Sequence, residues 1–405
     1  MRDSRGREAN DSLEELGLLV DTAGGVVAGH LLQKRESISP RTFLGRGKLE
    51  ELKGLIGRDS IDVAVFDEDL SPGQVRNLEK ELGIKVVDRS EVILHIFALR
   101  AKSSEARVQV ELAQLEYQLP RLTRLWKHLS RLGGGIGTRG PGETQLEVDR
   151  RRVREKIGSL KKQLAGVEKE RSVQRKKREN AFRVAIVGYT NAGKSTLFRV
   201  LTETEVFVED RLFATVDATT RRLGSIRAPS TVITDTVGFI KKLPHHLVTS
   251  FHATLEEVVQ ADLLLHVVDS SSSRAAQQAA TVEDVLVTMQ AGGKPVIIVL
   301  NKIDLAEEEA LQSLRYQFPS AVEISALKRV NIDALTERIL EAVRQRRVLV
   351  TVEIPLSEKR LLSHLRESCE FVEERTLTDR VSIQCWAGSD EVGRLSRRGF
   401  PVRFG

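Results

Sequence analysis

Apolar residues recur along this chain in two spacings, one typical of buried strands and one typical of amphipathic helices. Four short runs rich in Val, Ile and Leu are predicted strands: 182–187, 231–235, 295–300 and 322–325. A helical pattern follows the first run, over 196–201. Strands that alternate with helices predict an α/β domain in this part of the chain.

Two longer stretches carry apolar residues at intervals of three and four, which is the spacing of one helix face. The first runs from Val108 to Leu122 and the second from Leu146 to Val167. The run 131–142 between them holds six glycines, so we predict that the two helices fold back as an antiparallel hairpin. Pro120 lies inside the first stretch and should kink or break that helix. The glycine-rich run is either a disordered connector or a loop that becomes ordered against RNA.

The regions on either side of these stretches also alternate between strand and helix patterns. Runs 61–66 and 84–88 are predicted strands, and 47–53 and 72–82 predicted helices, which indicates a small α/β domain with a parallel sheet. The segment 45–48 resembles a phosphate loop superficially, but it lacks the spacing and the Ser or Thr, so we predict a backbone turn.

The end of the chain suggests a β-α-β order over 348–354, 358–366 and 381–386, without recognisable chemistry. We therefore expect four domains: an N-terminal α/β domain (1–104), the helical hairpin (105–180), a nucleotide-binding domain (181–347) and a small α+β module (348–405).

Composition indicates a soluble protein of several domains. The chain has 405 residues, 40% of them hydrophobic, and no run of about 18 uncharged apolar residues that could span a membrane. No apolar segment follows the charged N-terminus, as a secretory signal would require. Cys369 and Cys385 are too few for a disulfide scaffold and lack metal-ligand spacing, so we expect the reducing cytosol. We also expect a monomer, and peripheral membrane association stays open.

The formal charge is only +6, but it is distributed unevenly. The segment 150–178 contains thirteen Lys or Arg and only three Glu. A solvated helix face is the simpler interpretation, but such faces usually carry nearly equal numbers of both charges, so we favour a contact with a polyanion. The candidate RNA-binding residues of this segment and the glycine-rich run are Arg131, Arg139, Arg150, Arg151, Arg152 and Arg154.

The first predicted strand leads into a phosphate-binding loop, G-x-x-x-x-G-K-S. The loop glycines let backbone N–H groups surround a phosphate, and the following helix adds its positive N-terminal end. Lys194 supplies a charge for the β- and γ-phosphates, and Ser195 a hydroxyl for Mg²⁺. The nucleotide-binding residues of the loop are Gly188, Tyr189, Thr190, Asn191, Ala192, Gly193, Lys194 and Ser195.

Three further motifs follow, each at the end of a predicted strand, and they select GTP. Asp235 can hold the outer shell of Mg²⁺, and Gly238 lets a backbone N–H approach the γ-phosphate. Asp304 can accept two hydrogen bonds from guanine, a donor pair that adenine lacks. These motifs place the following residues around the nucleotide: Asp235, Thr236, Val237, Gly238, Asn301, Lys302, Ile303, Asp304, Ser325, Ala326 and Leu327.

Four segments, 88–100, 108–117, 131–150 and 212–221, resemble signatures of the HflX family of GTPases. The resemblance runs from about residue 22 to about residue 344. It implies a P-loop GTPase fold, Mg²⁺ as cofactor, and binding to the large ribosomal subunit and its rRNA. It adds a switch segment to the nucleotide site: Phe213, Ala214, Thr215, Val216 and Asp217.

Within this switch, the family pattern identifies Thr215 as the residue that closes on Mg²⁺ and the γ-phosphate, with Thr219 and Thr220 as rivals. The family segment usually reads T-L-D-P-T-T-R, whereas this chain has Val216 and Ala218 in place of the leucine and the proline. Losing the proline should loosen the switch while its hydroxyls stay in place. We therefore predict Ser195, Thr215 and the outer-shell Asp235 at the metal, and Lys194, Thr215 and Gly238 in catalysis.

The position after Gly238 often holds a water-orienting glutamine, but here it is Phe239. Either the protein is a weak or inactive hydrolase, or another group orients the water: a backbone group, a switch residue or a bound partner. Arg211, His245 and His246 are possible helpers. The expected function is a GTPase that acts on ribosomes. A nucleotide-gated switch that binds proteins is the alternative, and an RNA-remodelling ATPase is disfavoured by Asp304.

Overall fold

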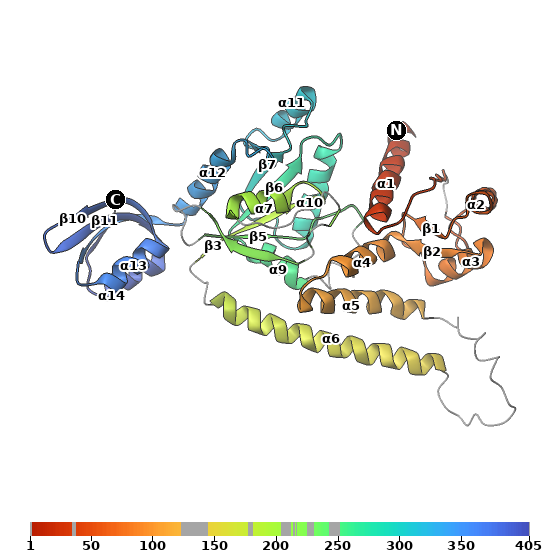
Figure 1. Cartoon of the computed structure of the whole chain (residues 1–405), viewed down its shortest axis with the longest axis horizontal. Coiled ribbons are helices and arrows are strands. Elements are labelled where there is room, and N and C mark those ends of the chain that lie inside the picture. Colours follow the sequence, from red (N-terminus) through yellow and green to blue (C-terminus); the bar gives the residue numbers. More distant parts are fainter. Residues whose placement is uncertain are drawn as a thin grey trace. The chain divides into compact units, whose positions relative to one another are not determined.

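The computed structural model describes residues 2–34, 38–122, 145–176, 181–203, 212–213, 215, 217–224, 231–242 and 252–404 (Figure 1). The chain divides into two compact units, and the division falls between Glu168 and Lys169. The four domain boundaries expected from the sequence remain a prediction. Among the described residues, no helix is both long enough and apolar enough to cross a membrane.

The first unit contains a two-stranded sheet and the helices around it. In chain order its elements are α1 (Arg2–Thr22), α2 (Arg46–Asp59), β1 (Val63–Phe66), α3 (Pro72–Leu82), β2 (Lys85–Asp88), α4 (Arg89–Arg100), α5 (Ser104–Gln118), the short 3₁₀ helix η1 (Leu119–Arg121) and α6 (Gln145–Lys176), which continues past the division. Strands β1 and β2 are parallel, with Val63 opposite Lys85 and Phe66 opposite Asp88. The predicted parallel α/β arrangement is confirmed.

Local sequence explains the helix that joins these strands. The hydroxyl of Ser71 accepts a hydrogen bond from the N–H of Gln74, whose side chain accepts one from the N–H of Ser71. Pro72 fits the first helical position because it has no N–H to satisfy there. The helix ends at Gly83, whose φ of +72° favours glycine. The buried core beneath it consists of Leu44, Leu49, Ala64, Phe66, Leu70, Leu78, Leu82 and Val86.

Helices α5 and α6 form the predicted antiparallel hairpin (Figure 1). Ion pairs join them, from Lys156 to Glu111 at 3.2 Å and from Lys161 to Glu116 at 2.8 Å. Helix α5 ends at Gln118 and the chain continues as η1, so the predicted interruption at Pro120 is confirmed.

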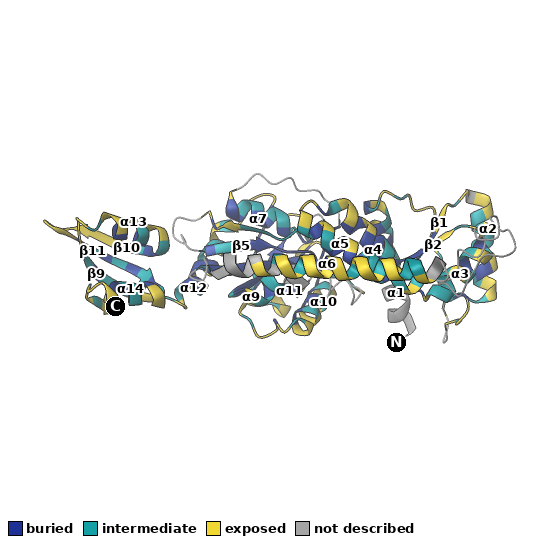
Figure 2. Ribbon diagram, turned by 90° about the horizontal axis from the view of Figure 1, so that it is seen from below, coloured by how far each residue is buried: buried dark blue, intermediate teal, exposed yellow. Residues whose placement is uncertain are grey.

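We call the row of apolar residues on the inner face of each hairpin helix its seam. The seam of α6 contains the predicted residues, whereas the buried face of α5 contains different ones. From residue 151 to 167, the only α6 residues that are not exposed are Val153, Ile157, Leu160, Leu164 and Val167. Figure 2 shows the rest of this stretch exposed. In α5 the buried positions are Ala106, Gln109, Val110, Leu112, Ala113 and Tyr117. This face is wider than the predicted seam because α5 packs against α4 as well as α6.

A buried carboxylate connects β2, α4 and the end of α5. Asp88 has no exposed surface and accepts hydrogen bonds from the hydroxyl of Tyr117 at 2.6 Å and from Arg121 at 2.8 Å. It also accepts from the N–H groups of Leu70 and Glu91. Burial and the Asp88 charge raise the pKa of Tyr117, so its hydroxyl stays a donor. Asp88 thereby fixes the base of the hairpin to the sheet.

The neighbouring Arg89 fastens α1, a helix that the sequence patterns did not predict. Its guanidinium is buried and donates to Asp67 at 2.8 Å and to Glu15 of α1. The hydroxyl of Ser12, also in α1, donates to Asp67 at 2.6 Å. The two contacts of α1 join residues 55 and 74 positions apart, which explains why local periodicity does not reveal them.

The second unit contains a six-stranded sheet in the order β4-β5-β3-β6-β7-β8. Its elements are β3 (Phe182–Gly188), α7 (Lys194–Thr202), β4 (Thr219–Arg222), β5 (Thr231–Asp235), α9 (His252–Gln260), β6 (Leu263–Asp269), α10 (Ala275–Thr288), β7 (Val296–Asn301), α11 (Glu308–Gln317), β8 (Val322–Glu323) and α12 (Ile332–Arg344). All neighbouring strands are parallel except β4, which is antiparallel to β5. Parallel pairing brings the ends of β3, β5, β7 and β8 to one edge, where the sequence motifs lie.

The end of the second unit is a four-stranded antiparallel sheet in the order β10-β11-β9-β12, with two helices beside it (Figure 1). Its elements are β9 (Val348–Pro355), α13 (Lys359–Ser368), β10 (Glu370–Thr376), β11 (Arg380–Ala387), α14 (Ser389–Arg397) and β12 (Val402–Phe404). The predicted α+β module is confirmed, but the predicted β-α-β is only part of a βαββαβ arrangement. Cys369 and Cys385 are free thiols in its core.

The Asp88 contacts generate a prediction about the stability of the first unit. Tyr117→Phe removes only the hydroxyl that donates to Asp88. We expect it to lower the free energy of opening of α4 and α5 by about 1–3 kcal/mol, because the buried carboxylate loses a donor. Native-state hydrogen exchange of peptides from α4 and α5 measures this change.

Tyr316→Phe is the matched control, because the Tyr316 side chain is 92% exposed, and it should change stability by less than about 0.5 kcal/mol. Equal protection of α5 in the two variants would contradict the role assigned to Asp88.

Candidate functional site

Two glycines of the phosphate loop are required by its close packing. At Gly188, φ is +153°, and a Cβ atom would lie 2.3 Å from the carbonyl oxygen of Val267. At Gly193, φ is +90°, and a Cβ atom would lie 2.2 Å from Nδ2 of Asn301. Both positions therefore exclude any other residue.

Lys194 stands at the first position of α7 and is 6% exposed. Its Nζ donates to the carbonyl oxygen of Tyr189 at 2.6 Å. Burial lowers the pKa of Lys194 to about 8, although the charge of Asp235 opposes that effect. A Cβ atom at Gly238 would lie 2.9 Å from this Nζ, so the Gly238 backbone lies directly against the lysine. The structure thus brings together the three groups expected around a γ-phosphate: the loop, Lys194 and Gly238.

The three residues predicted at the metal also meet. Oδ2 of Asp235 accepts hydrogen bonds from the hydroxyls of Ser195 at 2.7 Å and Thr215 at 3.0 Å. The two hydroxyls are 2.7 Å apart. Thr219 and Thr220 point elsewhere: Thr219 toward the carbonyl oxygen of Asp217, and Thr220 toward Thr234. Of the three candidate threonines, Thr215 is the one whose hydroxyl reaches Asp235.

This group has the chemistry that Mg²⁺ prefers. Asp235 is 3% exposed, and its second oxygen, Oδ1, is buried without a hydrogen-bond partner. Burial raises the pKa of Asp235, whereas the hydroxyls that donate to Oδ2 lower it. A buried carboxylate oxygen without a donor beside two hydroxyls is an all-oxygen set, which fits a hard divalent cation. The described residues contain no cluster of three or more His, Cys, Asp or Glu that would offer a different metal site.

The segment after Gly238 is held against the phosphate loop by its backbone. The N–H of Thr190 donates to the carbonyl oxygen of Phe239 at 2.8 Å, and the N–H of Phe239 donates to the carbonyl oxygen of Gly188 at 3.1 Å. Phe239 is 1% exposed, so its ring belongs to the core. The phenyl ring therefore has a structural role where a glutamine would contact water.

Asn301 connects the phosphate loop to the segment that follows β8. It is 2% exposed; its Nδ2 donates to the carbonyl oxygen of Ala192 at 2.9 Å, and its Oδ1 accepts from the N–H of Ala326 at 3.0 Å. Asp304 is exposed at the same edge. The predicted base-binding segments thus lie together, with the Asp304 carboxylate accessible to a ligand.

The remaining predicted nucleotide residues divide into buried and exposed groups. Buried are Tyr189, Thr190, Ala192, Phe213, Thr236, Val237, Ser325 and Ala326; partly buried are Asp217, Lys302 and Ile303; exposed are Asn191 and Leu327. Ala214 and Val216, and the possible helpers Arg211, His245 and His246, lie outside the described residues.

Two residues of β6 were missed by the sequence patterns. Asp269 pairs with Lys302 at 2.7 Å and so fixes the lysine between Asn301 and Asp304. The available sequence signal for Asp269 was its position at the end of a buried strand, which is also the position of Asp235 in β5. His266 is 1% exposed, its two ring nitrogens have no hydrogen-bond partner, and burial lowers its pKa to about 4, so the imidazole is neutral. A single histidine inside an apolar strand gave no comparable signal.

The predicted RNA-binding residues lie on α6 as far as the structure describes them. Arg151, Arg152 and Arg154 are exposed, and Arg151 makes a 3.9 Å ion pair with Glu155. Arg150 is partly buried and donates to the carbonyl oxygen of Leu122 at 3.0 Å. It therefore helps to close the hairpin. Arg131 and Arg139 lie outside the described residues.

Three family models match the chain in succession. One described as GTP-binding GTPase N-terminal matches residues 10–98, one described as GTP-binding GTPase middle region matches residues 100–178, and one described as 50S ribosome-binding GTPase matches residues 183–302. The matches cover the hairpin and the nucleotide site as far as residue 302.

Whole-length relatives agree with these models. GTPase HflX of Caldanaerobacter subterraneus subsp. tengcongensis is 47% identical over 379 residues, which cover 93% of this chain and 87% of the relative. GTPase HflX of Escherichia coli is 44% identical over 381 residues, covering 92% and 88%. A crystal structure of a GTP-binding protein from Sulfolobus solfataricus in complex with GDP is 28% identical, with a TM-score of 0.42, and covers 82% of this chain and 95% of that one.

The base-binding geometry generates a prediction about specificity. Asp304→Asn should weaken GTP binding by about 1–3 kcal/mol, roughly 5- to 150-fold, because the amide cannot accept both guanine hydrogen bonds. Relative affinity for xanthosine nucleotides should rise, since their 2-oxo group can accept from the new amide. Isothermal titration calorimetry with each nucleotide measures both effects.

Asp333→Asn is the control, because Asp333 is exposed in the first turn of α12 and belongs to no nucleotide motif. Unchanged GTP affinity in the Asp304→Asn variant would contradict the assignment of Asp304 to guanine binding.

Proposed function

We propose that this chain, which belongs to the HflX family of GTPases, is a Mg²⁺-dependent GTP hydrolase that acts on the large ribosomal subunit. GTP binding and hydrolysis would be coupled to ribosome association, splitting or rescue. GTP hydrolysis follows from the family. The proposed action on ribosomes rests on the exposed basic face of α6.

In this proposal, the hydroxyls of Ser195 and Thr215 would hold Mg²⁺, and Asp235 would act from its outer shell. Their meeting within 3.0 Å supports this assignment. The cation would neutralise charge on the β- and γ-phosphates. Thr215 is also the residue through which the switch segment responds to the γ-phosphate, because its hydroxyl is shared with the phosphate loop.

The residues present favour electrostatic stabilisation over base catalysis. Lys194 offers a positive charge, and the Gly238 backbone is close enough to it to contact the same phosphate. Phe239 has no polar atom in its side chain and is buried, so it does not hold the attacking water. We infer that the free protein hydrolyses GTP slowly and that a partner completes the site.

The basic face of α6 supports an RNA partner. Its apolar residues form one narrow seam, and the arginines 151, 152 and 154 lie on the exposed remainder. Exposed guanidinium groups attract phosphates over distances of about one Debye length, roughly 8–10 Å in physiological salt. The model described as 50S ribosome-binding GTPase, which matches residues 183–302, supports the large ribosomal subunit as the source of that RNA.

A nucleotide-gated switch that binds a protein is the second candidate. It would use the same hairpin as a docking arm. Binding to ribosomes that depends on salt and is lost after RNase treatment supports the RNA partner, whereas binding insensitive to both supports the protein switch. A monomeric protein of the cytosol fits either proposal.

Neutralising the exposed arginines should weaken ribosome binding. In a variant with Arg151, Arg152 and Arg154 replaced by Gln, the salt slope of binding should fall by roughly one unit for each lost phosphate contact. GTP affinity should stay unchanged. Arg150 is left intact because it donates to the Leu122 carbonyl oxygen. Sedimentation with large subunits at several salt concentrations measures both quantities.

A control variant removes the same charge elsewhere. It replaces three exposed arginines of the C-terminal module by Gln: Arg366, Arg375 and Arg397. Ribosome affinity and salt slope that survive in the α6 variant, or fall equally in both variants, would show that the basic helix is only a solvated surface.

The switch threonine should be required for stimulated hydrolysis. We expect free rates on the order of 10⁻⁴–10⁻² s⁻¹, as in unassisted small GTPases. Large subunits should raise the rate about ten- to a thousand-fold by ordering the switch, which corresponds to ~1.4–4 kcal/mol. Thr215→Ala should lose most of this stimulation in single-turnover assays, because the hydroxyl that reaches Asp235 is gone.

Thr215→Ser keeps that hydroxyl and should keep most of the stimulation. Phe239→Leu preserves an apolar core residue and should leave the free rate nearly unchanged. A Thr215→Ala variant that is still fully stimulated, or a free enzyme already near the stimulated rate, would contradict the assignment.

A further inference from the structure

The two cysteines of this chain meet in the C-terminal module. Cys369 and Cys385 are the only cysteines among the 405 residues, and both are free thiols. They belong to the same hydrophobic cluster and are 2% and 0% exposed. A single buried thiol packs like a small apolar residue, whereas two neighbouring thiols can join in a disulfide. The spacing of the two residues along the chain does not reveal this chemistry.

The strand register places both side chains on the same face of the sheet. Phe371 lies opposite Cys385 in the ladder between β10 and β11, and its ring packs against the hydrophobic cluster. Cys369 comes two residues before Phe371 and has an extended backbone, with φ −117° and ψ 150°. Because side chains alternate along extended backbone, Cys369 shares the face of Phe371. Cys369 and Cys385 are therefore diagonal neighbours across two paired strands.

The contact between them makes the two thiols chemically unequal. A hydrogen bond with Cys385 lowers the pKa of Cys369; Ser368 and the charge of Arg347 act in the same direction, whereas burial and Glu391 oppose them. The Ser368 hydroxyl lies 3.7 Å from the Cys369 sulfur. The same thiol contact, together with burial, raises the pKa of Cys385. A sulfur that ionises more easily beside one that stays protonated is the combination that a disulfide-forming pair uses.

The two thiols also differ in how an oxidant would reach them. Cys369 is the C-cap of α13, and its N–H donates to the carbonyl oxygen of Leu365 at 2.8 Å. Arg366 and Glu367 in the last turn of this helix are exposed. Cys385 lies in β11, which has β10 on one side and β9 on the other. Helix ends open more readily than central strands, so a small oxidant meets Cys369 first.

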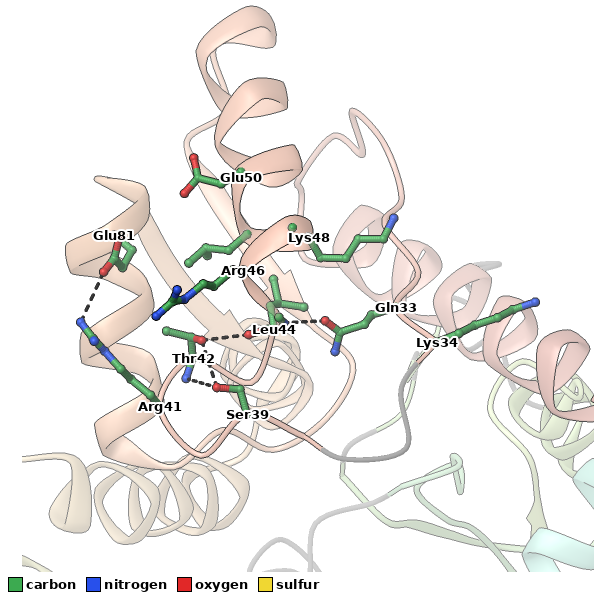
Figure 3. Close-up of a pocket in the computed structure, with 13 residues that line it drawn as sticks. Gln33, Lys34, Ser39, Arg41, Thr42, Leu44, Arg46, Lys48, Glu50 and Glu81 are labelled. Atoms are coloured by element: carbon green, nitrogen blue, oxygen red, sulfur yellow. Dashed lines mark hydrogen bonds and ion pairs between the residues drawn. The ribbon is translucent and has the colours of Figure 1, made fainter.

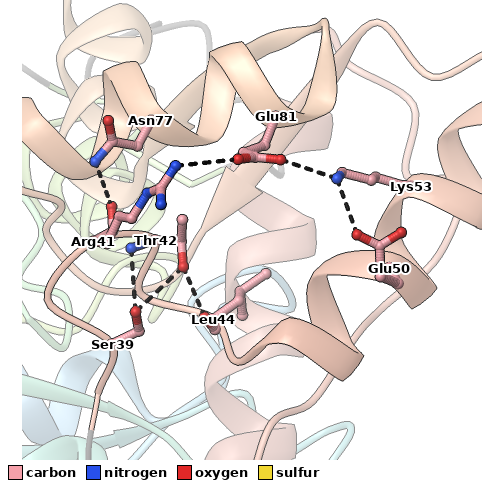
Figure 4. A network of polar contacts seen from close by, with 8 residues as sticks. All are labelled: Ser39, Arg41, Thr42, Leu44, Glu50, Lys53, Asn77 and Glu81. Carbon is pink, nitrogen blue, oxygen red and sulfur yellow. Dashed lines mark hydrogen bonds and ion pairs between the residues drawn. The ribbon is translucent and has the colours of Figure 1, made fainter.

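No other part of the chain contains a thiol. In the first unit, the open cavity beside the start of α2 is lined by polar, charged and aliphatic residues (Figure 3). Between α2 and α3, Lys53 lies 3.0 Å from both Glu50 and Glu81 (Figure 4). Neither region reacts with an oxidant of thiols. Oxidation of this kind is therefore confined to the C-terminal module, and the first unit serves as an internal reference.

The pair lies next to a contact that joins the C-terminal module to α12. Glu370, which follows Cys369, is 6% exposed and accepts a hydrogen bond from Nε of Arg344 at 3.1 Å. Arg344 is the last residue of α12. A disulfide requires Cβ atoms about 3.5–4.5 Å apart, which is closer than diagonal neighbours usually are. Closing the bond would therefore draw the end of α13 toward β11 and displace Glu370 from Arg344.

We propose that Cys369 and Cys385 form a redox-active dithiol, which peroxide converts to a disulfide that loosens the contact between Arg344 and Glu370. The Cys369 sulfur attacks one oxygen of hydrogen peroxide, the O–O bond breaks, and a sulfenic acid and water result. The Cys385 sulfur then attacks the sulfenic sulfur, the S–O bond breaks, and the hydroxyl leaves as water with the Cys385 proton. Peroxide is reduced by two electrons and the dithiol is oxidised by two. A reducing dithiol reverses the modification, as in transient disulfides of reducing compartments.

Thiol counting after oxidation of the native full chain tests this proposal. The protein is treated briefly with hydrogen peroxide, then denatured and labelled with N-ethylmaleimide, and mass spectrometry counts the labels. We expect the reduced protein to take up two labels, one for each cysteine, and the oxidised monomer to take up none. Dithiothreitol should restore both labels.

Single variants separate the roles of the two thiols. Cys385→Ala should leave a sulfenic acid at Cys369, which dimedone traps. In Cys369→Ala, the remaining thiol should react with peroxide at least about tenfold more slowly than the remaining thiol of Cys385→Ala. Slow hydrogen exchange in β9 and β11 shows that the module is folded in each variant, and the label count of the wild type does not depend on either of them.

Hydrogen exchange of the oxidised and reduced wild type reports the displacement of Glu370. Exchange at the end of α12 and in α13 should be faster in the oxidised protein, whereas α2 and α3, which carry the contacts of Figure 4, should exchange equally in both. Unchanged exchange in α12 and α13 would contradict the loosened contact.

Three results would overturn the dithiol itself: two labels on the peroxide-treated native protein while urea-unfolded protein loses both, a disulfide that forms only between two chains, or equal peroxide rates in the two single variants. None of these outcomes affects the proposed action on ribosomes, which the α6 variant tests separately.

Discussion

The buried carboxylate of Asp235 is the group on which the nucleotide site depends. It ends a central strand, one of its oxygens accepts hydrogen bonds from the phosphate loop and from the switch, and the other has no donor. Burying a charge in this way costs several kcal/mol unless a cation compensates it. Lys194 compensates part of it, and the proposed Mg²⁺ would compensate the rest. Oδ2 of Asp235 thus connects the phosphate loop to the proposed switch segment.

Local motifs could be predicted from the sequence because their chemistry is contiguous. The phosphate loop, the strand that ends at Asp235 and the N-K-x-D segment each carry their own constraint within eight residues. Parallel pairing then brings them to one edge of the sheet. The α6 seam was predictable for a similar reason, since a helix packed on one side shows its contacts in a single periodicity.

Long-range contacts were not predictable. The buried Arg89 reaches α1 through Glu15, and the α5 seam is wider than predicted because a second helix, α4, packs on it. Asp269 ends a buried strand, but its partner, Lys302, lies 33 positions away. The last two elements, α14 and β12, complete a sheet whose strand order no local pattern reveals. In each case the deciding partner lies far away in the sequence.

The first unit and the nucleotide site contribute different kinds of recognition in this account. The hairpin offers exposed charge on a helix held by one apolar seam and fixed at its base by Asp88. The second unit offers the proposed switch threonine, Thr215, whose hydroxyl donates to Asp235. Coupling between the two requires that the GTP-bound and GDP-bound forms differ in affinity for the same partner.

The most direct test is the equilibrium affinity of the wild-type protein for large ribosomal subunits, measured by sedimentation at one salt concentration with a non-hydrolysable GTP analogue and with GDP. The account predicts binding at least tenfold tighter with the analogue, a coupling free energy of about 1.4 kcal/mol or more. Equal affinity in the two nucleotide states, or no binding in either, would contradict it.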